Sequence, residues 1–307
     1  MTFELDQFTA LLVDALGEDC VLRDEPMSAH TTFNIGGPAD ILVRPESAEK
    51  LVAVLNLCKE HSVDFFVMGN GSDLLVSDKG IRGVVILLAD NFSEIKVDGA
   101  CVTAQAGAQL RDVALAAGAA GFSGFEPLWG IPATVGGACF MNAGAYGGEI
   151  SYVLKSLRAW DPASASVCEY GIDELAMGYR SSRVRTEGLV VIDATFELQP
   201  ADPAAIQEVM QDFQQRREDK QPLEMPSAGS TFKRPEGYFA GKLIMDAGLR
   251  GCSVGGAQVS TKHCGFVVNK GGATAEDVDN LIHHIQDEVM RQFGVELECE
   301  VRHIGEF

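Results

Sequence analysis

One stretch of the chain, Gly118–Gly148, carries nine glycines in 31 residues, whereas the overall content of 33 in 307 predicts about three. Because each glycine inside a helix or strand costs ~0.5–1 kcal/mol, the stretch is predicted not to form an ordinary helix or strand. Its backbone is expected to turn at positive φ or to approach a ligand closely. Gly130–Gly148 also holds no charged residue. Two interpretations stay open on composition: a wall against a large, apolar-faced cofactor, or a glycine-lined core between two packed layers.

The charge balance restricts the partners. With 24 Lys and Arg against 44 Asp and Glu, the net charge of −20 argues against nucleic acid and anionic membrane. The start, MTFELDQF, does not resemble a signal peptide, and the longest apolar run, Val84–Ala89, is far shorter than the ~20 residues that span a bilayer. The eight cysteines form no CxxC pair and are expected to be reduced core residues in a cytoplasmic protein without a metal.

Hydrophobic periodicity and turn residues predict the order of the elements. Helices are expected at 3–16, after the Ser47 cap, at 110–117 with Gly118 as the end, after Asp202-Pro203, at 238–246, and from Thr274 to Gly294. The helix after Ser47 is expected to carry Leu51, Val54, Leu55 and Cys58 on one apolar face, and the helix after Pro203 to turn Ile206, Val209, Met210 and Phe213 inward. Strands are expected at 39–44, 64–68, 84–88, 94–97, 101–104, 156–160, 166–170, 189–198 and 295–304. In the last of these, Val295, Leu297, Cys299 and Val301 alternate with charged residues. The first β-α-β piece favours parallel strands, and the middle of the chain favours an antiparallel α+β arrangement.

A glycine-rich turn, Gly69-Asn70-Gly71-Ser72, follows one predicted strand. Successive backbone N–H groups in such a turn can form a concavity that suits phosphate oxygens. The turn is neither GxGxxG nor a Walker loop, so a plain turn that feeds the next strand explains it at least as well.

A basic island lies between Ser227 and Lys270, where six Lys and Arg stand against two Asp and Glu. Its members are Lys233, Arg234, Lys242, Arg250, Lys262 and Lys270. A local cationic excess in an acidic chain is what a doubly charged phosphate substrate needs. The alternative is a solvated face whose lysines improve solubility, and we favour the anion site.

Three residues have side chains suited to catalysis. Ser230 lies beside Lys233 and Arg234, whose charge would stabilise its alkoxide, and Arg180 could hold a carboxylate or a developing enolate. Glu300 lies on the polar side of the predicted last strand. Taken alone, each is better explained as an ordinary turn serine, a surface arginine or part of a solvated acidic stripe.

Six segments together resemble the UDP-N-acetylenolpyruvoylglucosamine reductase family, the flavoenzymes of bacterial peptidoglycan precursor synthesis. They span nearly the whole chain in order: TTFNIGGPAD (31–40), GNGSDLLVSD (69–78), EPLWGIPATVGGACFMNAGAYGGE (126–149), GYRSSR (178–183), PSAGSTFKRP (226–235) and ECEVRHIGE (298–306). The resemblance implies a mixed α+β and α/β fold. It would combine the two-subdomain FAD-binding fold of the vanillyl-alcohol-oxidase (PCMH-type) superfamily with a C-terminal α+β substrate domain. The divisions expected are 1–78, 79–200 and 201–307.

The resemblance also implies a reaction, in which NADPH reduces non-covalently bound FAD and the enolpyruvyl ether of UDP-N-acetylglucosamine is then reduced to UDP-N-acetylmuramate. Arg180 and Glu300 would stabilise the enolate, and Ser230 would donate the proton. FAD would contact Asn34, Ile35, Gly36, Gly37, Gly69, Asn70, Gly71, Ser72, Gly130, Ile131, Pro132, Thr134, Gly136, Gly137, Asn142 and Gly144. Substrate binding is expected from Tyr146, Lys233, Arg234, Lys242 and Lys262. A monomer is expected.

The chain departs from the longer subtype of the family. Gly171–Gly178 is too short for the loop that carries a tyrosine over the substrate, so the shorter second subtype is implied, with Tyr146 or Lys262 as replacement. Trp129 stands where a small residue is expected, and Arg234 where the longer subtype has Asn. The competing hypotheses are an oxygen-using flavin oxidase of the same superfamily and a non-catalytic flavin or UDP-sugar binder. The lack of histidine in 62–118 disfavours covalent flavin attachment.

Overall fold

The structure is a computed structural model that describes residues 2–307, and the chain divides into two compact units. The first unit comprises Met1–Leu22, Ile41–Asn70 and Val84–Gln215, and the second comprises Arg23–Asp40, Gly71–Gly83 and Arg216–Phe307. Each unit has a hydrophobic core of its own. The expected three-part division at residues 78 and 200 stays a prediction.

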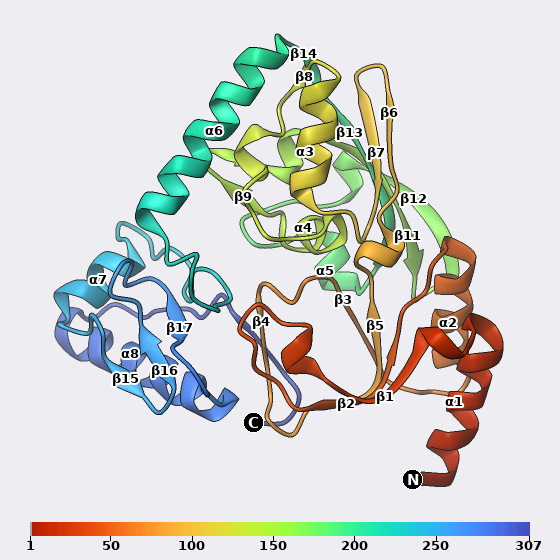
Figure 1. The fold of residues 1–307 in the computed structure, drawn as a ribbon, viewed down its shortest axis with the longest axis horizontal. Helices are drawn as coiled ribbons and strands as arrows, with labels where there is room; N and C mark the ends of the chain where they lie inside the picture. Colours follow the sequence, from red (N-terminus) through yellow and green to blue (C-terminus); the bar gives the residue numbers. More distant parts are fainter. Residues whose placement is uncertain (1) are drawn as a thin grey trace. The chain divides into compact units, whose positions relative to one another are not determined.

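Helices and strands alternate through both units (Figure 1). The helices are α1 (Thr2–Leu16), α2 (Ala48–Glu60), α3 (Leu110–Ala119), α4 (Val135–Met141), α5 (Arg183–Glu187), α6 (Pro203–Lys220), α7 (Ala240–Asp246) and α8 (Ala275–Phe293). The strands are β1 (Val21–Pro26), β2 (Pro38–Val43), β3 (Phe65–Met68), β4 (Leu74–Val76), β5 (Ile81–Leu87), β6 (Ile95–Asp98), β7 (Cys101–Gln105), β8 (Phe122–Ser123), β9 (Gly144–Ala145), β10 (Gly148–Glu149), β11 (Leu154–Asp161), β12 (Ser166–Gly171), β13 (Val190–Glu197), β14 (Gln199–Pro200), β15 (Ser253–Val254), β16 (Ala257–Val259), β17 (Val267–Asn269) and β18 (Arg302–Ile304).

A five-stranded antiparallel sheet, ordered β12-β11-β13-β7-β6, is the centre of the first unit. Its antiparallel pairing confirms the arrangement predicted for the middle of the chain. One face of β13 turns Ile192, Ala194 and Phe196 into the core, where α4 packs against β13 and β7. Figure 1 shows α3 beside the β6–β7 hairpin. The sheet therefore gives α4 a rigid support.

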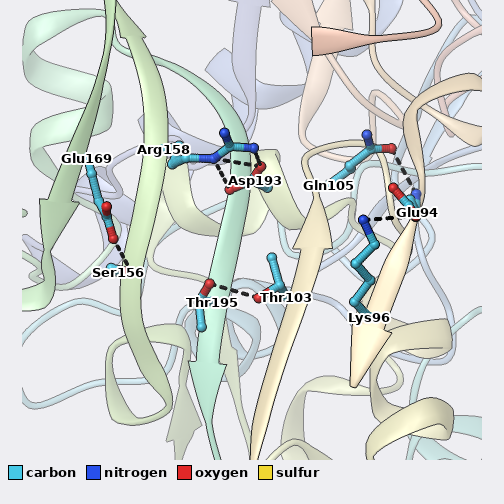
Figure 2. Close-up of polar contacts among 9 residues, drawn as sticks. All are labelled: Glu94, Lys96, Thr103, Gln105, Ser156, Arg158, Glu169, Asp193 and Thr195. Atoms are coloured by element: carbon cyan, nitrogen blue, oxygen red, sulfur yellow. Dashed lines mark hydrogen bonds and ion pairs between the residues drawn. The ribbon is translucent and has the colours of Figure 1, made fainter. Parts of the chain in front are cut away.

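The opposite face of this sheet is polar (Figure 2). Arg158 on β11 donates to Asp193 on β13 through Nε at 3.0 Å, and Thr103 on β7 lies 2.9 Å from the hydroxyl of Thr195 on β13. Hydrogen bonding to Asp193 raises the pKa of the Arg158 guanidinium. One apolar and one polar face is the usual pattern of an antiparallel sheet with a single covered side.

In the sheet ordered β1-β2-β5-β3, β3 pairs in parallel with β5. The first β-α-β piece consists of β2, α2 and β3, whose two strands are separated in this sheet by β5, so the parallel relation predicted for them stays a prediction. The helix between the strands begins as predicted: the Ser47 hydroxyl accepts the N–H of Lys50 at 3.3 Å. The side chains predicted to share its apolar face, Leu51, Val54, Leu55 and Cys58, are all fully buried. Burial of one such aliphatic side chain stabilises the fold by ~1.5–3 kcal/mol.

In the second unit, α8 covers the sheet ordered β15-β16-β17. The helix follows the predicted pattern. Thr274 caps its start in a reciprocal capping box with Asp277, and Gly294 ends it at φ +65°. The backbone N–H groups of Gly256 and Thr274 lower the pKa of the Asp277 carboxyl.

Three local predictions are wrong. The helix expected to end at Gly118 continues to Ala119, because Gly118 serves close packing: a Cβ there would lie 3.1 Å from Cγ2 of Ile206 on α6. Val209 on α6 is 42% exposed, although it was expected to point inward. The last strand is Arg302–Ile304 and not 295–304.

The last strand is short because most of its expected length has no regular partner strand. Leu297 and Val301 are buried, as the alternating pattern predicts. However, this segment pairs only through an isolated bridge between Phe232 and Cys299 until Arg302–Ile304 joins β4 in parallel. A strand needs a continuous ladder, which an alternating sequence cannot supply by itself. Among residues 2–307 no helix has both the length and the apolar character to cross a bilayer.

Candidate active site

In the first unit, two predicted cofactor segments, at Gly69 and at 130–144, meet residues 108–110 at one junction. The N–H of Val135 donates to the carbonyl of Ala108 at 2.8 Å, and the N–H of Leu110 donates to that of Ala133 at 3.0 Å. Gly69 is close to the same place, since a Cβ on it would lie 2.1 Å from Oγ1 of Thr134. A larger residue at 69 would therefore force the loops apart, and glycine is required there for close approach.

A reciprocal amide pair fixes this junction. Asn70 Nδ2 donates to Oε1 of Gln109 at 2.5 Å, and Gln109 Nε2 donates back to Oδ1 of Asn70 at 2.9 Å. Asn70 Nδ2 also donates to the carbonyl of Pro132 at 3.1 Å. Sequence analysis did not select Gln109, because the two partners are 39 positions apart and no local signal connects them. The side chain of Asn70 thus orders the loops, and its predicted contact with FAD stays a prediction.

The central glycine stretch contains a helix, which corrects the prediction that it would not. The helix α4, Val135–Met141, includes Gly136 and Gly137. Its glycines allow close contact, since a Cβ on Gly136 would lie 3.0 Å from Cβ of Ala106. Burial in this helix raises the pKa of the Cys139 thiol to about 12. That cysteine is therefore a core residue and not a nucleophile at neutral pH.

Arg180 lies in a tight turn closed by two backbone hydrogen bonds between Gly178 and Ser181, at 2.9 and 3.2 Å. Its φ is +54°, a left-handed conformation that is unusual for a residue with a side chain. The guanidinium carbon lies 4.9 Å from the ring centroid of Tyr179. Such conformations cost about 1–3 kcal/mol and gather at active sites, where neighbouring structure holds them in place.

Trp129 provides a test of whether this unit suits a bound cofactor. Its indole N–H is buried and has no hydrogen-bond partner among the described residues. Arg111 on α3 lies with its guanidinium carbon 5.6 Å from the ring centroid of Trp129. A buried donor without a partner is costly unless a ligand accepts the hydrogen bond. Together with the uncharged stretch that follows it, this donor fits the predicted flavin wall.

Tyr146 is at the tip of the β9–β10 hairpin. Tyr146 and Gly147 both have positive φ, +51° and +83°, as the two central residues of a type I′ turn require. The Tyr146 ring stacks on Phe213 of α6, with centroids 4.6 Å apart and an interplanar angle of 10°. The hairpin thus displays a half-exposed aromatic pair, and the predicted substrate contact of Tyr146 stays a prediction.

In the second unit, the loop that contains Asn34–Gly37 is held by close backbone contacts. The Gly37 N–H donates to the carbonyl of Ser77 at 2.9 Å, and a Cβ on Gly37 would lie 2.1 Å from the carbonyl oxygen of Asp78. Thr31 Oγ1 donates to the carbonyl of Ile35 at 2.8 Å, and Ile35 is buried. Gly71 joins this loop by accepting the N–H of Thr32 at 3.4 Å, with φ of +62° at Gly71.

The same unit brings two of the three predicted catalytic residues together. The Glu300 N–H donates to the carbonyl of Thr231, the residue after Ser230, at 2.8 Å. Thr231 is itself buried and fixed, since its Oγ1 accepts the N–H of Val267 at 3.0 Å. Ser230 is exposed and Glu300 is half-buried. Glu300 is therefore not on a fully solvated stripe, and its backbone is tied to the loop that carries Ser230.

The basic island is more neutral in three dimensions than in the sequence. Lys233 pairs with Glu298, and Lys242 pairs with Asp246. Lys262 donates to the carbonyl of Glu218 at 2.5 Å and lies 3.9 Å from the carboxylate of Glu224. Glu298 and Glu224 lie outside the 227–270 window, so a local charge count could not include them. The Arg234 guanidinium carbon lies 4.1 Å from the ring centroid of Phe239.

Comparisons with known proteins identify the domains and the family of this chain. A family model described as "UDP-N-acetylenolpyruvoylglucosamine reductase, C-terminal domain" matches residues 221–304, and one described as "FAD binding domain" matches residues 39–170. A UDP-N-acetylenolpyruvoylglucosamine reductase of Clostridium perfringens (strain SM101) is 54% identical over 299 residues, which cover 97% of this chain and 98% of that protein. One from Alkaliphilus oremlandii is 48% identical, over 96% and 97% of the two chains.

Solved structures confirm the fold class. The crystal structure of a UDP-N-acetylenolpyruvylglucosamine reductase from Thermus caldophilus has a TM-score of 0.79 at 34% identity and covers 93% of this chain and 98% of that one. An alkyldihydroxyacetonephosphate synthase, with a TM-score of 0.50 at 17% identity over 63% of this chain and 40% of that one, shares the fold alone. On the strength of the full-length relatives, the chain belongs to the UDP-N-acetylenolpyruvoylglucosamine reductase family.

Proposed function

We propose that this protein reduces the enolpyruvyl ether of UDP-N-acetylglucosamine to UDP-N-acetylmuramate for peptidoglycan synthesis, with FAD as cofactor and NADPH as reductant. The observation that carries the proposal is the extent of the match: 54% identity over 97% of this chain and 98% of a relative named as this reductase. The unpartnered Trp129 donor and the glycine-lined junction at residue 69 support the FAD assignment.

The chemistry sets what the protein must supply. FAD, when bound, supplies hydride transfer between NADPH and the substrate. A vinylic ether accepts a hydride only if the negative charge that develops on its carboxylate side is stabilised. A guanidinium binds such a carboxylate with two parallel hydrogen bonds, which is the role proposed for Arg180. Glu300 must donate a hydrogen bond to stabilise an enolate oxygen, so we propose that its carboxyl group is protonated in the complex.

The substrate then needs a proton at the carbon that carried the developing charge. We propose that Ser230 donates it, with Lys233 and Arg234 as the neighbouring cations that favour the serine alkoxide. The exposure of Ser230 and the fixed backbone of Thr231 beside it support this role, because a proton donor needs an accessible hydroxyl on a rigid base. Arg180 belongs to the first unit, whereas Ser230 and Glu300 belong to the second.

The remaining assignments follow from this function. We propose that Asn34–Gly37, Gly69–Ser72 and the residues selected in 130–144 bind FAD, Asn142 through its main chain only because its side chain bonds within the protein. We propose that Tyr146, Lys233, Arg234, Lys242 and Lys262 bind the nucleotide sugar. The three-part division at 78 and 200 assigns the first two parts to FAD and the last to the substrate. We further propose a monomer in the cytoplasm, which sedimentation and cell fractionation would test.

The experiment is steady-state NADPH oxidation by the purified protein with and without the enolpyruvyl sugar. We expect a yellow protein whose NADPH oxidation requires the sugar and forms UDP-N-acetylmuramate, identified by mass spectrometry. NADPH oxidation at the same rate without the sugar, together with peroxide formation, would favour the flavin oxidase. A protein that binds the UDP-sugar or flavin without turnover would contradict any catalytic role.

A further inference from the structure

We propose that Asn142 is a positioning residue that holds the turn bearing Arg180 in its active shape. The side chain of Asn142, at the end of α4, lies against the carbonyl of Gly178. Gly178 is the first residue of the turn that bears Arg180. The proposal rests on the function proposed above, because that function gives Arg180 its role.

The side chain of Asn142 is committed to partners within the first unit. Asn142 is 1% exposed. Its Nδ2 donates to the carbonyl of Gly178 at 3.1 Å and to Oε2 of Glu149 at 2.9 Å, and its Oδ1 accepts the N–H of Ser151 at 3.0 Å. Both amide protons are therefore used, so the side chain is fixed in orientation. A buried amide with this many bonds rigidifies the segments that it joins.

The residue type suits the position. Asn142 follows the last turn of α4 with φ +45° and ψ +56°, the left-handed conformation that asparagine tolerates better than other residues with a Cβ. Asparagine also offers two donors to the two acceptors that it meets here. Aspartate has the same shape but no donor, and it would place a second carboxylate against Glu149.

The turn that Asn142 contacts needs such support. Arg180 has φ +54°, a conformation that persists in residues with a side chain only where the surroundings hold it. A second bond fastens the other end of the turn to α4, since Ser182 Oγ donates to the carbonyl of Phe140 at 2.8 Å. Because α4 packs against β13 and β7, both ends of the Arg180 turn are tied to a helix supported by the central sheet.

The consequence is specific to one chemical step. Without the Asn142 donor, the carbonyl of Gly178 loses its side-chain partner and the turn can relax toward ordinary backbone angles, which moves the Arg180 guanidinium. A displacement of about 1 Å in a positioned group can cost up to ~10²-fold in rate. The loss should fall on reduction of the sugar, where Arg180 acts, and not on oxidation of NADPH.

The test uses Asn142→Gly, which keeps the left-handed conformation without cost, and Asn142→Asp, which keeps the shape. Rapid mixing would measure flavin reduction by NADPH and then flavin reoxidation by the enolpyruvyl sugar. We expect reoxidation to slow about tenfold or more in both variants, with NADPH-driven reduction within twofold of the unchanged protein. Hydrogen–deuterium exchange over residues 178–182 should become faster. Ser151→Ala, which removes a hydroxyl on the Glu149 side of Asn142, is the matched control and should leave both steps unchanged.

A double-mutant cycle separates positioning from general damage. In an Arg180→Ala background, Asn142→Gly should cause no further loss of reoxidation rate, because the group that it positions is already absent. An equal loss in both backgrounds, a parallel loss of both steps, or unchanged exchange at 178–182 would overturn the proposal. If the unchanged protein does not reduce the sugar, the proposed function fails, and the exchange experiment alone decides whether Asn142 holds the turn.

Discussion

The two units hold their candidate catalytic residues in different ways. In the first unit, side chains fix the Arg180 turn: Asn142 binds the carbonyl of Gly178, and Ser182 binds that of Phe140. In the second unit, a main-chain bond ties Glu300 to the Ser230 loop, since the Glu300 N–H donates to the carbonyl of Thr231, and the Thr231 hydroxyl anchors that loop by accepting the N–H of Val267. Side-chain fixation depends on residue type, whereas main-chain fixation tolerates most substitutions.

The two units therefore hold their candidate catalytic residues for different purposes. The first unit orders loops through side-chain amides: the buried Asn142 and the half-buried pair of Asn70 and Gln109. The second unit presents Ser230 on an exposed loop, beside a glycine with φ +74° and open space around it. Substitution of Asn142 in the first unit should thus affect the geometry of the Arg180 turn, whereas substitution of Ser230 in the second should affect the proton transfer.

The largest expected effect is from Ser230→Ala in the second unit. Loss of a positioned proton donor slows the step that it serves by ~10²–10⁴-fold. We expect reduction of the enolpyruvyl sugar to slow by this factor while flavin reduction by NADPH continues at its original rate. Rapid-mixing absorbance at the flavin band measures both steps. A similar loss in the two steps would contradict the proton-donor role.

Arg180→Lys should have the next largest effect and tests the first unit. Lysine keeps the charge but cannot form the paired hydrogen bonds of a guanidinium. We expect sugar reduction to slow by ~10²–10³-fold, because one stabilising donor set is lost in the transition state. The same kinetic assay applies. A variant with normal turnover would show that a positive charge at position 180 is sufficient without the paired hydrogen bonds. Precise positioning of the residue by the first unit would then have no effect on the reaction.

Trp129→Phe should weaken FAD binding about fivefold, the factor that corresponds to one hydrogen bond of ~1 kcal/mol. Fluorescence titration of the FAD-free protein measures this without reference to turnover. The matched control is Trp160→Phe, since the Trp160 N–H already donates to Oδ1 of Asn56 at 3.0 Å. That control should lower the melting temperature and leave FAD affinity unchanged. If the Trp129 variant bound FAD as tightly as the unchanged protein, the cofactor contact proposed for Trp129 would be contradicted.

Asp277→Asn tests stability in the second unit and should have the smallest effect, about 1 kcal/mol as for other capping interactions. Because the pKa of Asp277 is lowered in the folded protein, its contribution is present above the ordinary value of 3.8 and is lost as the pH falls toward the folded value. The difference in thermal stability between the two proteins should therefore be largest near pH 7 and shrink progressively as the pH falls below 3.8. A pH-independent difference would contradict this origin.

Local features of the fold were predictable from the sequence. The Ser47 cap, the four-residue apolar face of α2 and the Thr274–Gly294 helix follow from signals within a few positions of each other. The α4 helix was not predictable, because its glycine cost is offset by contacts with Ala106 and β13, far away in the sequence. The last strand is shorter than expected for the same reason, because its hydrogen-bond ladder depends on a partner strand that is distant in the sequence.

The candidate site was predictable only through the family resemblance. Composition and spacing left Arg180, Ser230 and Glu300 as ordinary polar residues. The link between Glu300 and the Ser230 loop arises from a hydrogen bond to Thr231 across 69 positions, and no sequence pattern marks it. Gln109 and the structural use of Asn142 were missed for the same reason: their partners are brought near by the fold.

The most direct test of the central claim is anaerobic reoxidation of the NADPH-reduced protein by the enolpyruvyl sugar. We predict that one equivalent of the sugar restores the oxidised flavin spectrum and yields one equivalent of UDP-N-acetylmuramate. A reduced flavin that persists with the sugar and is reoxidised only when oxygen is admitted would contradict the reductase assignment and favour an oxidase.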